Sequence, residues 1–225
     1  MGAPIVEELR NRVAGESPGW LTVTNRAGVA ELRIHGVIGD PFDGNTSGEV
    51  AERIAAIDAD EILVVINSPG GSIFDGIAIT NALRSHPARV VTRVDGLAAS
   101  IASVIVQAGD ERVMSPGAQM MIHRASGVSI GDADTMLQMA ELLDRQDAVI
   151  AGLYVERGGQ PIDDVKRWMA DETWYDADEA VMAGLADRVG PVEDGQGPQN
   201  AVSGSEGVSA VGTVPSAELA LALLD

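Results

Sequence analysis

Short apolar or β-branched runs alternate along the chain with longer stretches in which apolar residues recur at helical spacing. This alternation is typical of α/β proteins. The predicted strands are Trp20–Asn25, Ala30–Ile38, Glu61–Ile66, Val90–Val94, Arg112–Met114 and Gln119–His123. The predicted helices are Ser47–Ile57, Gly76–Ser85, Leu97–Ala108, Ala133–Arg157, Ile162–Ala170 and Ala177–Ala183. The pattern therefore predicts one α/β domain over residues 20–190.

Both ends of the chain lack this pattern. Residues 1–19 are polar and contain Gly15, Pro18 and Gly19, so we expect a flexible N-terminal arm. Residues 191–225 are rich in Gly, Pro, Gln, Asn, Ser and acidic residues. Such a composition cannot bury a core, which predicts a flexible acidic C-terminal tail.

Two of the predicted helices differ in their surroundings. The helix Leu97–Ala108 is apolar on most sides and is expected to be buried, with Gly96 before it and Gly109 capping its end. The long helix Ala133–Arg157 places apolar residues among acids and is therefore amphipathic. We expect it to project from the main body and to serve as an oligomer contact.

Composition narrows the chemistry that the chain can perform. The 225 residues contain no cysteine, which excludes disulfides, thiolate metal sites and cysteine nucleophiles. A net charge of -19 repels nucleic acid and anionic membranes, so neither is an expected partner. The first residues lack the order of a secretory signal, and no apolar run reaches about 18 residues. We therefore predict a soluble, cytoplasmic protein.

A glycine-bearing loop, Ile66–Ser72, directly follows an apolar strand. Gly70 and Gly71 permit backbone conformations that other residues resist, so their N–H groups can point into a cleft. Such a loop can form an oxyanion hole, or bind a phosphate or a peptide backbone. An ordinary strand-to-helix turn explains the same residues equally well.

Ser100 follows small residues between a predicted strand and the buried helix. Near a helix N-terminus, free N–H groups and the positive end of the helix dipole stabilise a developing anion. Ser100 is therefore a candidate nucleophile. Taken alone, the position is explained better by a serine that merely caps the helix.

His123 ends the short apolar strand that begins at Gln119. A histidine at a strand end can present its imidazole to a cleft and act as a general base near neutral pH. A lone histidine is more commonly structural or exposed, and we expect His35 and His86 to be such cases.

Taken together, three stretches resemble the proteolytic subunit of the Clp protease, ClpP, of serine peptidase family S14. These are Ile66–Ser72, Gly96–Ile101 and Met121–His123, and residues Glu179–Asp187 resemble the closing helix and turn of that family. The similarity covers roughly residues 30–190. The resemblance implies a spiral of repeated ββα units, the fold shared by ClpP and the crotonases.

By this resemblance the chain is a serine endopeptidase without a cofactor or a metal. Ser100 is the nucleophile and His123 the base, while N–H groups of Gly70 or Gly71 and of Ile101 hold the oxyanion. Each of these roles suits serine-peptidase chemistry, in which a base activates a weak hydroxyl and amide donors stabilise the tetrahedral intermediate.

The third member of the triad matches the family less well. An ungapped comparison places Trp168 where housekeeping enzymes carry aspartate, and a short slip brings Asp171, with Glu172 beside it, to this position. We choose Asp171 as the residue that orients His123. Two solvated acids at a helix end explain the same residues equally well.

The leader strand, the aromatic pair Trp174-Tyr175 and the acidic tail resemble phage and prophage relatives that process capsid or scaffold proteins during head maturation. The expected partners are such a protein substrate and further copies of the chain in a heptameric ring or stacked heptamers. Three alternatives stay open: a housekeeping Clp subunit working with an ATPase unfoldase, a catalytically silent structural protein, and a crotonase-type acyl-CoA enzyme.

Overall fold

The computed structural model describes residues 21–26, 28–39 and 47–191. Contacts divide the chain into Met1–Val192 and Glu193–Asp225, and every described residue belongs to the first unit. The predicted N-terminal arm and, apart from Pro191, the predicted tail lie outside the described residues, as does Trp20.

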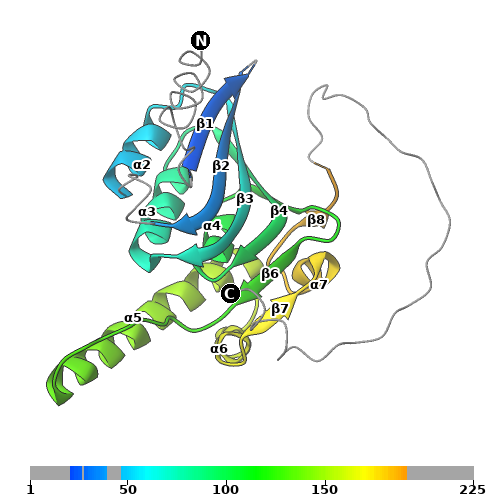
Figure 1. Cartoon of the computed structure of the whole chain (residues 1–225). Helices are drawn as coiled ribbons and strands as arrows, with labels where there is room; N and C mark the ends of the chain where they lie inside the picture. Colours follow the sequence, from blue (N-terminus) through cyan, green and yellow to red (C-terminus); the bar gives the residue numbers. More distant parts are fainter. Residues whose placement is uncertain (1–20, 27, 40–46, 192–225) are drawn as a thin grey trace, which may run out of the picture. The chain divides into compact units, whose positions relative to one another are not determined.

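Eight strands form one mixed sheet in the described part of the chain (Figure 1). The strands are β1 Leu21–Arg26, β2 Val29–Ile38, β3 Glu61–Gly71, β4 Arg89–Ala99, β5 Glu111–Met114, β6 Gln119–Ile122, β7 Thr173–Tyr175 and β8 Arg188–Val189. Along the main path the order is β1-β2-β3-β4-β5-β8, antiparallel between β1 and β2 and parallel thereafter. The α/β fold expected from the sequence is confirmed.

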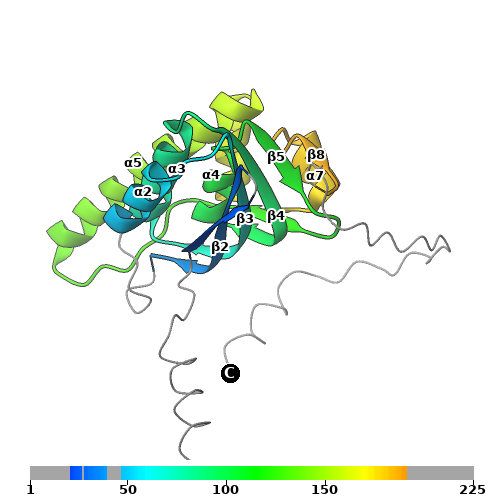
Figure 2. The same cartoon turned by 90° about the horizontal axis from the view of Figure 1, so that it is seen from above.

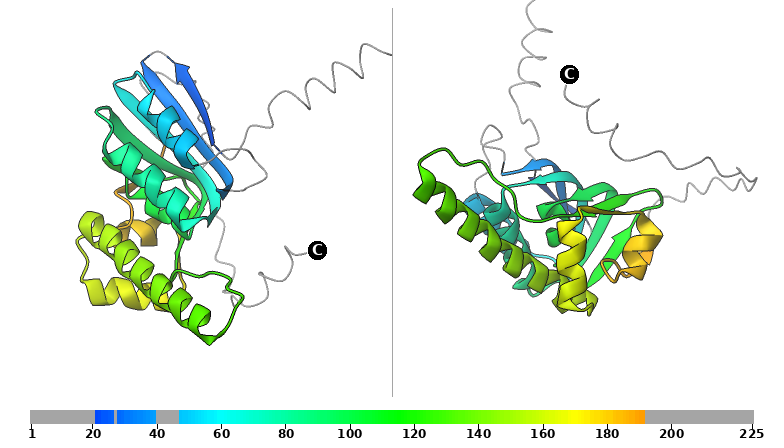
Figure 3. Two further views of the ribbon diagram at one scale, coloured as in Figure 1. Left: turned by 90° about the vertical axis from the view of Figure 1, so that its left-hand side faces the viewer. Right: turned by 90° about the horizontal axis from the view of Figure 1, so that it is seen from below.

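In the described part of the chain, three helices connect parallel strands and three lie between β6 and β8. They are α2 Ser47–Ala55, α3 Ile73–Arg84, α4 Ile101–Val106, α5 Ala133–Gly158, α6 Ile162–Ala170 and α7 Ala177–Met182. Figures 1 and 3 show α2 and α3 side by side against one face of the sheet. The N-terminal end of α5 extends away from the strands in Figures 1 and 2, as the amphipathic pattern predicts.

Side chains of β3 enter two separate apolar clusters. Ile62, Val64 and Ile66 of β3 belong to the large core beneath the helices, whereas Leu63 and Val65 belong to a second, smaller cluster. Because successive side chains of a strand point to opposite faces, β3 is buried on both. Its continuous apolar run, rather than an alternating one, is the sequence signal of this position.

The helix predicted over Leu97–Ala108 is wrong at its start, because it begins at Ile101 and Leu97–Ala99 remain in β4. Ile66 pairs with Val94 and Ser68 with Ala98, so Asp95, Gly96 and Leu97 bulge opposite one residue of β3. The Leu97 N–H donates to Asn67 Oδ1 at 3.1 Å and holds this bulge in place.

Because of the bulge, β4 pairs with two different strands, β5 and β6, on the same edge. Before it, Val91–Val94 pair with β5, and after it, Leu97–Ala99 pair with β6. The strand β7 then pairs antiparallel with β6. Neither β7 nor β8 was predicted, since runs of two or three residues carry no periodicity that a pattern can detect.

Candidate active site

Ser100 occupies a strained turn between β4 and α4. Its φ of 55° and ψ of -130° lie outside the favoured regions for a residue with a side chain. The Ser100 N–H donates to the Met121 carbonyl at 2.9 Å, continuing the parallel pairing of β4 with β6. Although Ser100 is the N-cap of α4, its hydroxyl makes no capping hydrogen bond. The hydroxyl is therefore available for another partner.

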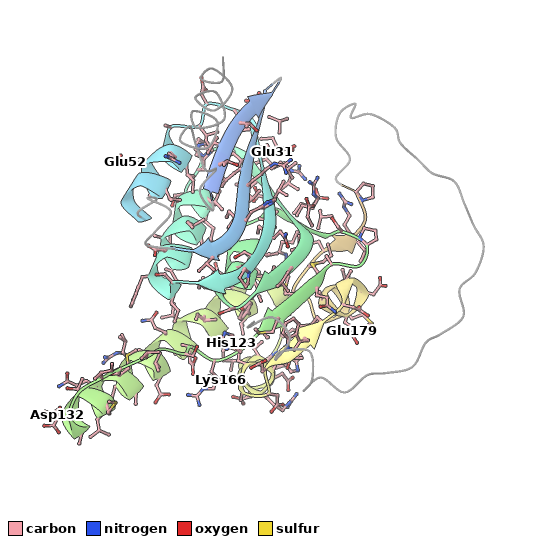
Figure 4. The ribbon with its side chains drawn as sticks, in the orientation of Figure 1. Glu31, Glu52, His123, Asp132, Lys166 and Glu179 are labelled. Atoms are coloured by element: carbon pink, nitrogen blue, oxygen red, sulfur yellow. The ribbon has the colours of Figure 1, made fainter. Side chains whose placement is uncertain are left out.

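That partner is His123. Its Nε2 lies 2.7 Å from Ser100 Oγ, within hydrogen-bond distance. Figure 4 shows His123 directly after β6, beside the end of β4 from which Ser100 follows. For Ser100 to donate its proton, His123 must be neutral with its proton on Nδ1. The geometry is that of a hydroxyl beside a general base.

The glycine loop packs against the nucleophile turn. Gly70 has φ 101°, and a Cβ built there would lie 2.7 Å from Ser100 Cβ and 2.8 Å from the Ala99 carbonyl oxygen. The Gly70 N–H donates to Ser68 Oγ at 3.1 Å, and Ser68 Oγ in turn donates to the Gly36 carbonyl at 2.6 Å. The Gly70 N–H thus already has an acceptor, and Gly71 rather than Gly70 lines the cavity beside Ser100.

A small cavity of about 40 Å³ brings most of the predicted site residues together. Gly71, Ser100, Ile101 and His123 all line it. Its remaining walls are Ile73, Val104, Arg124, Ala125, Ser126, Ile150 and Tyr154. Ile101 is the first residue of α4, where a helix has no internal acceptor for the N–H. Gly71 and Ile101, both expected from the resemblance to supply oxyanion donors, therefore line the same cavity as Ser100.

The backbone on the far side of His123 is anchored to two helices. The Arg124 N–H donates to the Met169 carbonyl of α6 at 3.0 Å. Asp147 of α5 accepts from the Ala125 N–H at 2.6 Å and from Arg124 Nε at 2.6 Å. Sequence reasoning missed Asp147, because an acid on a helix surface gives no sign of a partner far along the chain.

Asp171 is not brought to the imidazole. It is the C-cap of α6, and within the described residues no hydrogen bond joins Asp171 or Glu172 to His123. The antiparallel pairs of β6 and β7 end with Ile122 opposite Thr173, so the next pair along the register is His123 with Glu172. Glu172 also has a positive φ of 49°.

The buried hydroxyl groups of Ser103 and Tyr154 form hydrogen bonds that hold the turn at Ser100. Ser103 Oγ donates to the Ser100 carbonyl at 2.5 Å and lies 2.7 Å from the Tyr154 hydroxyl. Because the single Ser103 proton is used on the carbonyl, Tyr154 must donate to Ser103. Burial raises the pKa of Tyr154 well above its ordinary value, so the phenol stays neutral. No pattern in the sequence indicated this pair.

Other features of the described residues carry less chemistry. Two larger cavities, of about 280 and 390 Å³, are not lined by Ser100 or His123. His86 is structural as expected, since its ring nitrogens contact the Ile57 carbonyl and the Ala88 N–H, both at 3.1 Å. Within the described ranges, no cluster of three or more His or acidic residues could hold a metal, and no helix is long and apolar enough to span a membrane.

Comparison with known proteins identifies the family of the chain. The Clp protease family model matches residues 31–193. The chain is 34% identical to the ATP-dependent Clp protease proteolytic subunit of Pleurastrum terricola, over 65% of this chain and 80% of the relative. It is 30% identical to subunit 1 of Gloeobacter violaceus, over 79% of this chain and 92% of the relative. Subunit 1 of Streptomyces coelicolor is 33% identical, over 68% and 72% respectively.

The extent of the match confirms the similarity expected over roughly residues 30–190. These relatives do not support the narrower resemblance to phage head maturation proteases. Their names fit the alternative of an ATP-dependent Clp subunit at least as well.

Proposed function

The chain belongs to the Clp protease family, a family of serine endopeptidases, and we propose that Ser100 and His123 perform its peptide-bond cleavage. The observation that carries this proposal is the 2.7 Å separation of Ser100 Oγ from His123 Nε2. The strained backbone at Ser100 adds to it, because strain that surrounding structure maintains is commonly found at functional sites. A serine that merely capped α4 would need neither feature.

In the proposed reaction His123 takes the Ser100 proton while Oγ attacks the carbonyl carbon of the scissile peptide bond. The carbonyl oxygen becomes an oxyanion held by the N–H groups of Gly71 and Ile101. His123 then gives the proton to the leaving amine, and an acyl-enzyme remains. Water attacks that ester by the same steps, with His123 again as the base. Loss of one oxyanion donor typically lowers the rate by roughly 10²- to 10³-fold.

The third member of the triad is a choice between neighbours. Asp171 remains our prediction from the sequence, but the β6–β7 register favours Glu172, which follows opposite His123. Glu172 directly precedes β7 and His123 directly follows β6, so the two residues come next after the last strand pair, Ile122 with Thr173. The positive φ of Glu172 supports the same choice.

Labelling with a small fluorophosphonate tests the nucleophile. Wild type should form one covalent adduct on Ser100, detected by intact mass and peptide mapping. Ser100→Ala should abolish it, His123→Ala should slow it by at least about 10³-fold, and Ser85→Ala, at an exposed helix end, should leave it unchanged. Equal labelling of Ser100→Ala and wild type would refute the assignment. An unlabelled wild type would favour the silent structural protein or a crotonase-type enzyme.

The paired variants Asp171→Asn and Glu172→Gln test the acid. The residue that orients His123 should lower kcat by about 10²-fold or more when its charge is removed, and should change the pH profile of kcat/KM. The neighbour should change neither by more than about threefold. If both variants keep wild-type kinetics, neither Asp171 nor Glu172 is the triad acid.

The relatives' names favour a proteolytic subunit that works in an ATP-dependent Clp complex over a phage maturation enzyme. We propose a homo-oligomeric ring, with a heptamer or stacked heptamers as the expected size. Co-expression separates the two functions, because a Clp ATPase partner should stimulate degradation of a folded substrate. A capsid or scaffold protein trimmed by wild type alone, and not by Ser100→Ala, would restore the phage assignment.

A further inference from the structure

We propose that Ser103 and Tyr154 are positioning residues that hold Ser100 in its strained conformation, so that its hydroxyl faces His123. This inference rests on the proposed function of Ser100. Ser103 contacts the carbonyl oxygen of Ser100 rather than its hydroxyl, and Tyr154 contacts Ser103. Both residues therefore act on the reaction through the backbone that carries the nucleophile.

The conformation of Ser100 needs support on both sides of its Cα atom. A residue with a side chain rarely adopts a φ of 55° with a ψ of -130°, and such a conformation persists only where the surrounding structure over-determines it. On the N-terminal side, the Ser100 N–H donates to the Met121 carbonyl at 2.9 Å. On the C-terminal side, ψ sets the direction of the Ser100 carbonyl, so this carbonyl needs a partner of its own.

Ser103 is that partner, and it contributes two donors. Its N–H donates to the Ser100 carbonyl at 3.0 Å and its Oγ donates to the same oxygen at 2.5 Å. A carbonyl oxygen has two lone pairs, so Ser103 alone satisfies the hydrogen-bonding capacity of this oxygen. A helical serine commonly donates its hydroxyl to the carbonyl three or four residues before it. At this position the acceptor belongs to the nucleophile, so the bond fixes the direction of the Ser100 carbonyl.

Tyr154 fixes the rotamer in which Ser103 makes this bond. The Tyr154 hydroxyl donates to Ser103 Oγ at 2.7 Å, which leaves the Ser103 proton for the Ser100 carbonyl. Ser103 is fully buried and Tyr154 is 2% exposed, so solvent does not readily replace either partner. The two residues lie on different helices, α4 and α5, so the pair ties the turn at Ser100 to a second helix.

Thr92 provides a matched control at the opposite end of α4. Its Oγ1 donates to the Val106 carbonyl at 2.9 Å, and the residue is fully buried. Thr92→Val therefore removes a buried hydroxyl that bonds to a carbonyl of α4, but it leaves the contacts of Ser100 unchanged. A buried hydrogen bond of this kind contributes to stability wherever it lies, so Ser103→Ala and Thr92→Val should lower Tm to a similar extent.

The experiment measures fluorophosphonate labelling of Ser100 over a range of reagent concentrations, at equal folded fraction by circular dichroism. Ser103→Ala should lower the maximal rate constant at least about tenfold, since a misplacement of about 1 Å at a reacting group can cost about 10²-fold. Tyr154→Phe, which keeps the ring, should lower it at least about threefold. The reagent concentration at half-maximal rate should stay within about twofold, because the lost bonds orient the nucleophile and do not bind the reagent. Thr92→Val should change neither value by more than about twofold.

A double variant tests whether Tyr154 acts through Ser103. Once Ser103→Ala has removed the hydroxyl that Tyr154 holds, adding Tyr154→Phe should slow labelling by no more than about twofold further, because the effects of residues in one hydrogen-bond network are not additive. Independent roles would instead multiply the two losses.

Three results would overturn the inference while leaving the proposed function intact. The first is a Ser103→Ala protein that labels within about threefold of wild type. The second is a Thr92→Val protein that slows as much as Ser103→Ala, and the third is a double variant whose loss is the product of the two single losses. If Ser103→Ala does not fold, Tyr154→Phe decides, and labelling within about twofold of wild type overturns the inference. Failure of the proposed function itself looks different, because wild type would then not be labelled at Ser100.

Discussion

Replacing Gly70 by alanine should disable Ser100 without unfolding the protein. A Cβ at position 70 would lie 2.7 Å from Ser100 Cβ and 2.8 Å from the Ala99 carbonyl oxygen. Neither contact can be relieved by the far end of a flexible side chain. The backbone that carries the nucleophile must therefore move.

The size of this movement sets the expected rate. Non-bonded carbons approach favourably at about 3.5 Å, so the two Cβ atoms must separate by roughly 0.8 Å. A misplacement of about 1 Å at a reacting group can lower a rate by about 10²-fold. In addition, alanine at the Gly70 φ of 101° costs roughly 1–3 kcal/mol of stability. We expect fluorophosphonate labelling of Ser100 to slow by about 10²-fold.

Gly117→Ala is the matched control. Gly117 also has a positive φ, 82°, but a Cβ there meets no atom within 4 Å. It should therefore carry a similar backbone cost without displacing Ser100. Labelling rates are compared at equal folded fraction, measured by circular dichroism. The reasoning is refuted if Gly70→Ala labels within about threefold of wild type, or if Gly117→Ala loses as much activity.

Three further variants have defined outcomes. Burial opposes ionisation of Asp187, but hydrogen bonds from Arg112 outweigh burial and lower the pKa of Asp187 below its ordinary 3.8. Ionised Asp187 therefore stabilises the folded state at pH values above the pKa of the unfolded chain, and this stabilisation is lost as the pH falls through the folded-state pKa. Asp187→Asn should lower the free energy of unfolding, measured with urea at neutral pH, by about 2 kcal/mol. This is less than the loss of a fully buried ion pair would cost, because the Asp187 side chain is 39% exposed. An equally large loss at about pH 3 would contradict this explanation. Asp147→Ala removes the acceptor of the Ala125 N–H and should lower kcat about tenfold with little change in KM, whereas a raised KM with unchanged kcat would indicate a binding role instead. Gly152→Ala, in α5 with open space around it, should raise stability by about 0.5–1 kcal/mol without changing labelling, and a lower Tm would argue against this environment.

The sequence located the elements well where local interactions decide them. Ile162–Ala170 was predicted to the residue, and the long helix from Ala133 ends one residue later than predicted. Apolar periodicity and capping residues act within a few positions along the chain, so a pattern reveals them. The start of α4 was misjudged because Leu97–Ala99 are apolar and small, which suits a strand and a helix equally.

The residues of the candidate site could be predicted from the sequence, but their arrangement could not. Gly70-Gly71, Ser100 and His123 were identified from the sequence because the three stretches that contain them together resemble the Clp protease family, although none was decisive alone. The 2.7 Å separation of Ser100 Oγ from His123 Nε2 depends on the pairing of β4 with β6, which cannot be read from the sequence. The bulge opposite Asn67 creates that pairing by freeing the end of β4 from β5.

By itself, the sequence determined the α/β fold class, the order of most elements, and the serine and histidine that carry the proposed chemistry. Only the tertiary structure decided that the Gly70 N–H is paired with Ser68, that Glu172 follows opposite His123, and that Tyr154 lines the cavity beside Ser100. The physical reason is that strand register and side-chain packing join residues distant along the chain. Such contacts leave no periodic trace in the sequence on either side of them.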